Sequence, residues 1–223
     1  MLSRRQRSLV QSPSSSFDLE YHLREIERLV AALSLRPDAY LGPQGAAIPD
    51  IEWYALAAIK KTASLSHAFC TLVRAKNTLA AAALVRLQLD TAMRMFGLTQ
   101  VEDIETAGTW LMNDNSYRKL KARTGEALSD TFLHRKLDEK YPGLSEAYEA
   151  ASGYVHLSGQ HIKTGLWSQE GSSILFFDLK GTDDARPDEW FADIIDAFDQ
   201  ATKLTAELIA EFRLTRTQHR ATN

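Results

Sequence analysis

Three charged residues follow one another at four-residue intervals in the most apolar part of the sequence. Arg86, Asp90 and Arg94 lie within residues 77–96, which are otherwise rich in alanine, leucine and methionine. In a helix this spacing puts the three side chains on one face, where arginine and aspartate form ion pairs. The face is either open to solvent or part of a polar cleft. In a cleft, an arginine held by an aspartate is well prepared to bind a phosphate or carboxylate.

A second group of polar side chains lies within residues 152–161, and its candidate residues are Tyr154, His156, Ser158 and His161. Histidine exchanges a proton near neutral pH and serves as a general acid or base. His156 is the stronger candidate because apolar residues flank it on both sides. The alternative is a helix end and a loop, in which these side chains cap local backbone groups.

Common motifs of nucleotide, metal and hydrolase chemistry do not occur in the sequence. We find no P-loop, no GxGxxG, no His-Glu-x-x-His and no GxSxG. The single cysteine, Cys70, cannot form an intrachain disulfide or supply a cysteine-based zinc site. Its apolar neighbours predict an unreactive thiol in the core. We therefore expect neither a metal nor a cofactor.

The composition is that of a folded, water-soluble protein of 223 residues with 44% apolar and 25% charged residues. A net charge of −3 argues against broad binding to phosphate backbones, which requires a basic face. The apolar runs are shorter than the roughly 20 residues that span a bilayer, so we expect no contact with a membrane. One cysteine fits a reducing compartment, and we expect the cytoplasm.

Residues 1–16 differ from the remainder, because they carry three arginines, no acidic residue and a serine- and proline-rich stretch. This composition predicts a flexible basic tail. Two alternatives remain open, an arm that touches nucleic acid and a short targeting peptide. Residues 17–219 show no change of composition and are expected to form one helical domain.

Helical spacing of apolar residues predicts a mainly all-α antiparallel bundle of six or seven helices. The expected helices cover residues 17–34, 51–74, 77–96, 101–112, 131–141, 146–154 and a long segment after Pro187. We expect a turn near Lys76 and Asn77, a C-terminal cap at Gly97, an N-terminal cap at either Ser129 or Asp130, and another N-terminal cap at Ser145. The segments 161–167 and 173–179 predict a small β-hairpin insert.

Two motifs in the sequence carry a resemblance to a known group. Leu84, Arg86 and Asp90 fit the pattern L-x-R-x-x-x-[DE], and residues 148–158 fit Y-x-x-x-S-x-x-x-H-x-S. The chain thereby resembles uncharacterised bacterial helical-bundle proteins that are similar to the wider HEPN group. That group includes RNases of toxin–antitoxin, abortive-infection and CRISPR systems, and also partners without catalytic activity.

The sequence departs from the catalytic HEPN signature, in which a histidine follows an arginine after four to six residues. Only Arg213 and His219 have that spacing. The resemblance therefore implies a ligand- or partner-binding or regulatory module of a bacterial defence or toxin–antitoxin system. A metal-independent RNase is the first alternative, with His156 as acid or base and Arg86 stabilising the transition-state charge. A homodimeric scaffold is the second. RNA, a nucleotide, a second copy and a partner protein remain open as binding partners.

Overall fold

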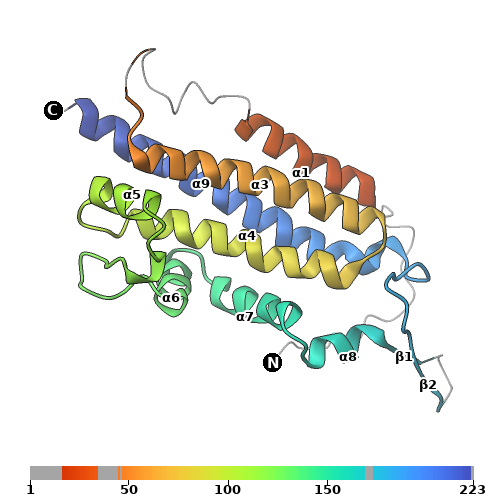
Figure 1. The fold of residues 1–223 in the computed structure, drawn as a ribbon. Coiled ribbons are helices and arrows are strands. Elements are labelled where there is room, and N and C mark those ends of the chain that lie inside the picture. The colour runs from red at the N-terminus through yellow and green to blue at the C-terminus, as the bar shows by residue number, and fades with distance from the viewer. Residues whose placement is uncertain (1–16, 35–44, 46, 169–172, 222–223) are drawn as a thin grey trace.

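The computed structural model describes residues 17–34, 45, 47–168 and 173–221 of the chain (Figure 1). The basic tail expected over residues 1–16 lies outside the described residues, as does most of the loop expected over residues 35–49.

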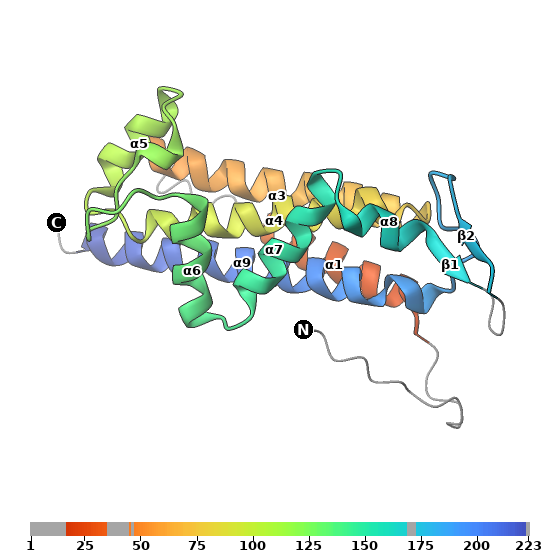
Figure 2. The same ribbon diagram turned by 90° about the horizontal axis from the view of Figure 1, so that it is seen from below.

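Four long helices lie side by side and form the body of the molecule (Figures 1 and 2). They are α1 (Leu19–Ser34), α3 (Asp50–Arg74), α4 (Thr78–Leu98) and α9 (Ala192–Ala221). The apolar helix α4 is central, because it packs on α3, α9 and the shorter helices that follow it. In the core, the rings of Phe69 and Phe198 stack with their centroids 4.0 Å apart. The expected mainly α-helical bundle is confirmed.

Local capping signals explain where several helices begin. α3 and α4 are separate helices because Lys76 takes a positive φ of 55° and the Asn77 side chain accepts a hydrogen bond from the Ala80 amide. The expected turn at these two residues is confirmed. Ser129 begins α6 (Asp130–Lys140) in the same way, by accepting from the Phe132 amide at 3.2 Å. The remaining elements on this side are α5 (Ile104–Met112), the short 3-10 helix η1 (Tyr117–Lys119) and α7 (Leu144–Val155).

Two of the expected caps are wrong. Gly97 lies inside α4, which continues to Leu98, and a Cβ at this glycine would overlap the Tyr117 hydroxyl. Ser145 lies inside α7, which begins after Gly143 with its φ of 95°. Both residues make tertiary contacts instead of capping a helix. Gly97 leaves room for Tyr117, and the Ser145 hydroxyl is hydrogen-bonded to the His134 side chain at 2.9 Å.

The β-hairpin is shorter than expected and follows a helix. Its strands are β1 (Leu166–Ser168) and β2 (Leu175–Phe177), which pair antiparallel with Trp167 opposite Phe176. Residues 161–165 of the strand expected over 161–167 are instead part of helix α8 (Gly159–Gly165). A second 3-10 helix, η2 (Asp188–Phe191), leads into α9. Within the described part of the chain, no helix is long and apolar enough to cross a membrane.

Cys70 is expected to resist alkylation in the native protein. Its side chain is buried in the core, and burial raises the pKa of the thiol to about 12, so very little thiolate is present near neutral pH. Treatment with iodoacetamide at pH 8, followed by mass spectrometry, is expected to leave the native chain unlabelled. The same treatment in urea is expected to label it fully. Rapid labelling of the native protein would contradict this burial.

Candidate functional site

The charged stripe of α4 faces neighbouring elements rather than open solvent. The side chains of Arg86, Asp90 and Arg94 keep only 15%, 22% and 14% of their exposure. Charged groups in such positions have to be paired, because an unpaired charge loses its hydration without compensation. The pairing partners come from α6, α7 and η1, and together they make one connected network.

Arg86 is held by two side chains of α7. Its Nε donates to the Ser152 hydroxyl at 3.1 Å, and its Nη2 donates to the Tyr148 hydroxyl. The guanidinium also lies over the Tyr148 ring, 3.8 Å from the centroid, in a cation–π contact. Tyr148 and Ser152 belong to the second of the two sequence motifs, so the fold brings parts of both motifs into contact. Arg86 thereby fixes α7 on α4.

Asp130 is the centre of the network, although the sequence indicated only its position at a helix start. It accepts hydrogen bonds from the Nη2 atoms of Arg94 and, at 2.6 Å, of Arg118. The Nη2 of Arg86 lies 3.8 Å from the same carboxylate. Burial alone would raise the pKa of Asp130, but the hydrogen bond from Arg94 and the surrounding arginine charges lower it overall. The carboxylate therefore stays ionised well into the acidic range.

Arg94 joins this network to α3. Its Nη2 lies 2.9 Å from Asp90, and its guanidinium lies 4.8 Å from the centroid of the Tyr117 ring. The Tyr117 hydroxyl in turn donates to the backbone carbonyl of Arg94 at 2.6 Å. On α3, the ammonium group of Lys61 lies 3.5 Å from Asp90. The network therefore links α3, α4, α6, α7 and η1.

One donor in this network has no acceptor. The Nη1 of Arg94 is buried and makes no hydrogen bond with the described residues. Arg94 also lines a small cavity of about 140 Å³ between α3 and α4, to which Tyr54 and Lys61 contribute their side chains. The remaining lining residues are Ala57, Ala58, Thr91 and Met95. Burial raises the pKa of Tyr54 to about 12, so its hydroxyl remains a hydrogen-bond donor at neutral pH.

The residues expected between positions 152 and 161 do not form one site. His156 is exposed at the end of α7 and makes no hydrogen bond or ion pair with the described residues. Ser158 accepts from the Gln160 amide at 3.2 Å, and the Nδ1 of His161 accepts from the Ser158 amide at 3.2 Å. Ser158 and His161 thus form the capping box of α8.

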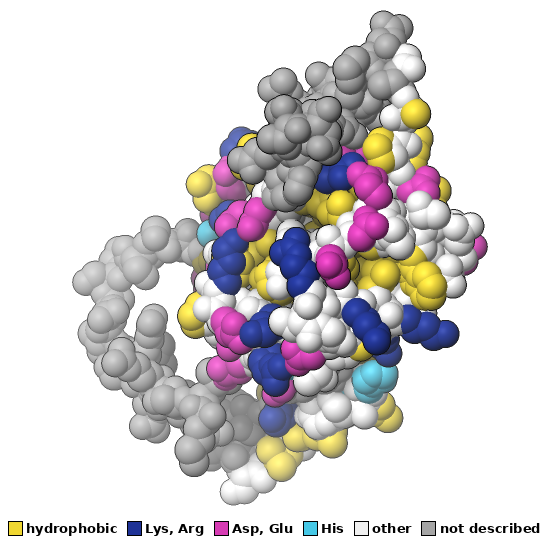
Figure 3. Space-filling model, turned by 90° about the vertical axis from the view of Figure 1, so that its left-hand side faces the viewer, with side chains coloured by type: hydrophobic (Ala, Val, Ile, Leu, Met, Phe, Trp, Pro, Cys, Tyr) yellow, Lys and Arg dark blue, Asp and Glu magenta, His cyan; other side chains and the backbone are white. Residues whose placement is uncertain are grey.

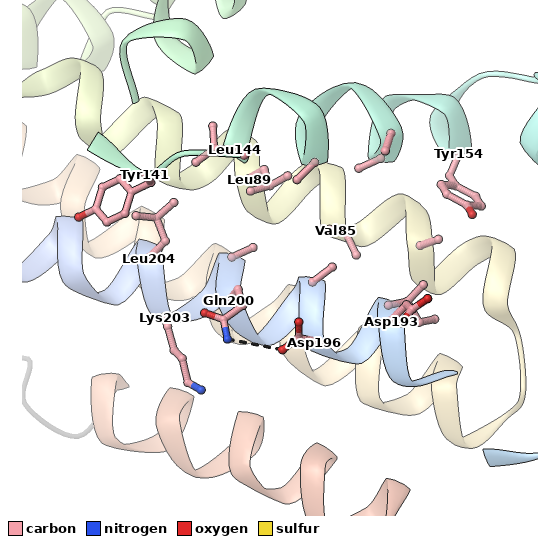
Figure 4. Close-up of a pocket in the computed structure, with 18 of the residues that line it drawn as sticks. Val85, Leu89, Tyr141, Leu144, Tyr154, Asp193, Asp196, Gln200, Lys203 and Leu204 are labelled. Carbon is pink, nitrogen blue, oxygen red and sulfur yellow. Dashed lines mark hydrogen bonds between the residues drawn. The ribbon is translucent and has the colours of Figure 1, made fainter. Parts of the chain in front are cut away.

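Tyr154 lies apart from the arginine network and lines an apolar groove (Figure 4). The groove has a volume of about 570 Å³ and runs between α7 and α9, with α4 as its floor. It is hollow because six alanines line it, namely Ala82, Ala147, Ala150, Ala151, Ala197 and Ala201. Tyr141 and Tyr154 lie at its two ends, and burial followed by the nearby Asp193 charge raises the pKa of Tyr154.

The surface charge is mixed on the face shown in Figure 3. Lysine and arginine side chains alternate there with aspartate and glutamate, and no broad basic area is visible. This face offers no continuous track for a phosphate backbone. The side chain of His219, which has the HEPN-like spacing to Arg213, lies outside the described side chains.

Comparison with known proteins gives no relative for this chain. No family model, no curated protein and no solved structure matches it. Among the described residues, no group of three or more histidine, cysteine, aspartate or glutamate side chains could hold a metal ion. The functional interpretation therefore rests on the arginine network, the cavity and the groove.

Proposed function

We propose that this chain is a regulatory binding module that recognises a phosphate or carboxylate group in the cavity beside Arg94. The observation that carries the proposal is the buried Nη1 of Arg94, which lacks an acceptor although Arg94 lines a cavity. A buried donor without an acceptor destabilises the folded state, and a bound water or anion usually supplies the missing acceptor. The cavity of about 140 Å³ is several times the volume of one water molecule.

The charges of the network favour an anion over a neutral ligand. Of its charged residues, Arg94 and Lys61 line the cavity. Over the whole network, four positive charges from Arg86, Arg94, Arg118 and Lys61 exceed the two negative charges of Asp90 and Asp130. An anion in the cavity would balance part of this excess. Arg94, Lys61 and the Tyr54 hydroxyl would provide donors to it from two helices.

Regulation follows from the position of Arg94 in the network. The same guanidinium that lines the cavity holds Asp130 at the start of α6. An anion that accepts a hydrogen bond from this guanidinium would change the strength of the Arg94–Asp130 pair. It would thereby change the packing of α6 on α4. The resemblance to the HEPN group suggests a bacterial defence or toxin–antitoxin setting, in which a nucleotide phosphate is the ligand that we expect.

We do not propose the RNase alternative. It requires His156 close to Arg86, but the described contacts of Arg86 are with Tyr148, Ser152, Asp90 and Asp130. His156 contributes to none of them. A catalytic acid or base has to reach the reacting atoms directly or through one water.

Inorganic phosphate is expected to stabilise the protein. At ten times its Kd, a ligand that binds only the folded state adds about 1.4 kcal/mol to the free energy of unfolding. Chemical unfolding in phosphate should therefore show a higher midpoint than unfolding in chloride at the same ionic strength. Titration calorimetry then gives the Kd directly.

Two substitutions test the location of this site. Lys61→Met and Tyr54→Phe each remove a donor from the cavity and leave the Arg94–Asp130 pair intact, so both should weaken phosphate binding. Lys203→Met removes an exposed lysine of α9 that pairs with Asp199, and it should leave phosphate binding unchanged. Equal stabilisation of all three variants by phosphate would overturn the proposed site.

A further inference from the structure

The segment from the end of α7 to β2 exposes an unusual amount of apolar surface. We call residues 155–168 and 173–180 the arm, and Figures 1 and 2 show that these residues project from one end of the bundle. Ten of its large apolar residues are exposed, namely Val155, Leu157, Ile162, Leu166, Trp167, Ile174, Leu175, Phe176, Phe177 and Leu179. Leu157 and Leu179 keep 93% and 90% of their exposure.

The exposed apolar area of the arm is that of an interface. With about 200 Å² for a fully exposed large apolar residue, the ten residues present on the order of 1,000 Å². Apolar patches on monomeric proteins rarely exceed a few hundred Å². A stable protein–protein interface buries about 800 Å² on each partner. The summed area of the arm reaches this size, and it is spread over both faces of the hairpin because successive strand residues point to opposite sides.

The internal structure of the arm also calls for a partner. Its two strands are three residues long, and their only large stacked pair is Trp167 on Phe176, with centroids 4.5 Å apart. All three residues of β2 are exposed. An isolated two-stranded hairpin is marginally stable in water. Cover from another surface would remove this apolar area from water and stabilise the hairpin.

The same chain carries a hollow surface that an arm would fill. The groove between α7 and α9 is about 18 Å long, which is the length of the 12 residues of α7. Its six alanines leave space for larger apolar side chains. Its Tyr154 end lies next to the point where the arm leaves α7.

We infer that two copies of this chain form a symmetric dimer in which the arm of each copy packs into the α7–α9 groove of the other. A two-fold axis makes the two contacts identical, so one projecting apolar surface and one apolar groove on each copy are both covered. This inference is independent of the anion cavity beside Arg94, which lies between α3 and α4.

The charges around the groove support a second copy as the occupant. Asp193 and Asp196 line the groove and form no ion pair with the described residues. The arm carries Lys163 and Lys180, which are exposed and likewise lack an ion-pair partner in the described part of the chain. Asp178 of the arm accepts a hydrogen bond from the Lys180 amide, and Asp196 of the groove accepts one from the Gln200 side chain at 3.5 Å. Cross-dimer pairs between these lysines and aspartates would fix the orientation of the arm.

Sedimentation equilibrium of the full chain between about 1 and 100 μM tests the dimer. The wild type is expected to dimerise. Leu175→Asp places a charge on the arm, and Ala150→Glu places one in the groove; both positions are exposed in the single chain, so the fold should survive. Each variant is expected to raise the dimer Kd roughly 30-fold or more, which is the loss of one interface hot spot. The control Trp53→Ser removes an exposed apolar residue of α3 and should leave the Kd unchanged.

The pattern across the variants decides the outcome. A wild type that remains monomeric would overturn the inference, as would a dimer that survives either variant. Loss of the dimer in Leu175→Asp alone would mean that arm pairs with arm, which also overturns the assignment of the groove. A short bis-maleimide is expected to join Leu175→Cys to Ala150→Cys when the two variants are mixed, since the buried Cys70 contributes no product. Cross-linking only within each unmixed variant would contradict the exchange of arms.

Discussion

Replacement of Asp130 by alanine is expected to lower the free energy of unfolding by about 2–3 kcal/mol at pH 7. The substitution leaves Arg94 and Arg118 without the carboxylate to which both donate, and it leaves Asp90 as the remaining acidic neighbour of Arg86 and Arg94 in the network. Loss of one partner from a fully buried pair costs about 3–5 kcal/mol. The effect here is smaller because the Asp130 side chain keeps 19% of its exposure.

The acid dependence of this loss has a definite sign. The pKa of Asp130 is lowered below its usual 3.8 in the folded state, so the unfolded chain takes up a proton first as the pH falls. The stabilisation by Asp130 is fully present above pH 3.8 and is lost as the pH falls through the folded pKa. The stability difference between the wild type and Asp130→Asn should therefore shrink below pH 3.8.

Urea unfolding followed by circular dichroism at pH 7, pH 5 and pH 3 measures these differences. Glu149→Ala is the matched control, because Glu149 is an exposed residue of α7 outside the network, and we expect a change within about 0.5 kcal/mol. A loss at Asp130→Ala no larger than that of the control would show that the network contributes nothing to stability. A stability difference that does not depend on pH would exclude the ionised carboxylate as its cause.

Replacement of Gly97 by alanine is expected to destabilise the protein by about 2–3 kcal/mol. Helix propensity alone predicts the opposite, a gain of about 1 kcal/mol inside a helix. A Cβ at Gly97 would overlap the Tyr117 hydroxyl and would lie 2.8 Å from the Cδ2 of Leu133. Tyr117 cannot move freely, because its hydroxyl bonds the Arg94 carbonyl and its ring packs on the Arg94 guanidinium.

Gly159→Ala is the control for this experiment, because a Cβ at Gly159 meets no atom within 4 Å. We expect a change in stability close to zero or slightly favourable. Thermal unfolding of the two variants beside the wild type gives the comparison. If Gly97→Ala is as stable as the wild type, then the close packing of Tyr117 against α4 is not required by the fold.

The helical bundle and several helix boundaries could be predicted from the sequence alone. The turn at Lys76 and Asn77 and the N-terminal cap at Ser129 follow from interactions within a few residues. The sequence also placed Arg86, Asp90 and Arg94 on one face of a helix, because helical periodicity is a local property. These features do not depend on how the helices pack.

Which residues contact that face depends on how the helices pack. Asp130, Tyr148 and Ser152 lie 36 to 66 positions along the chain from the arginines of α4 to which they are hydrogen-bonded. No local pattern encodes such pairs, since they depend on the packing of α6 and α7 on α4.

Local rules also failed where two structures compete for the same residues. Residues 161–167 were expected to form a strand of the hairpin, but the capping box of Ser158 and His161 begins a helix there. The groove and the exposed arm could not be predicted from local patterns either. Both consist of side chains that have few neighbours in the folded chain, and the number of neighbours depends on how the helices pack.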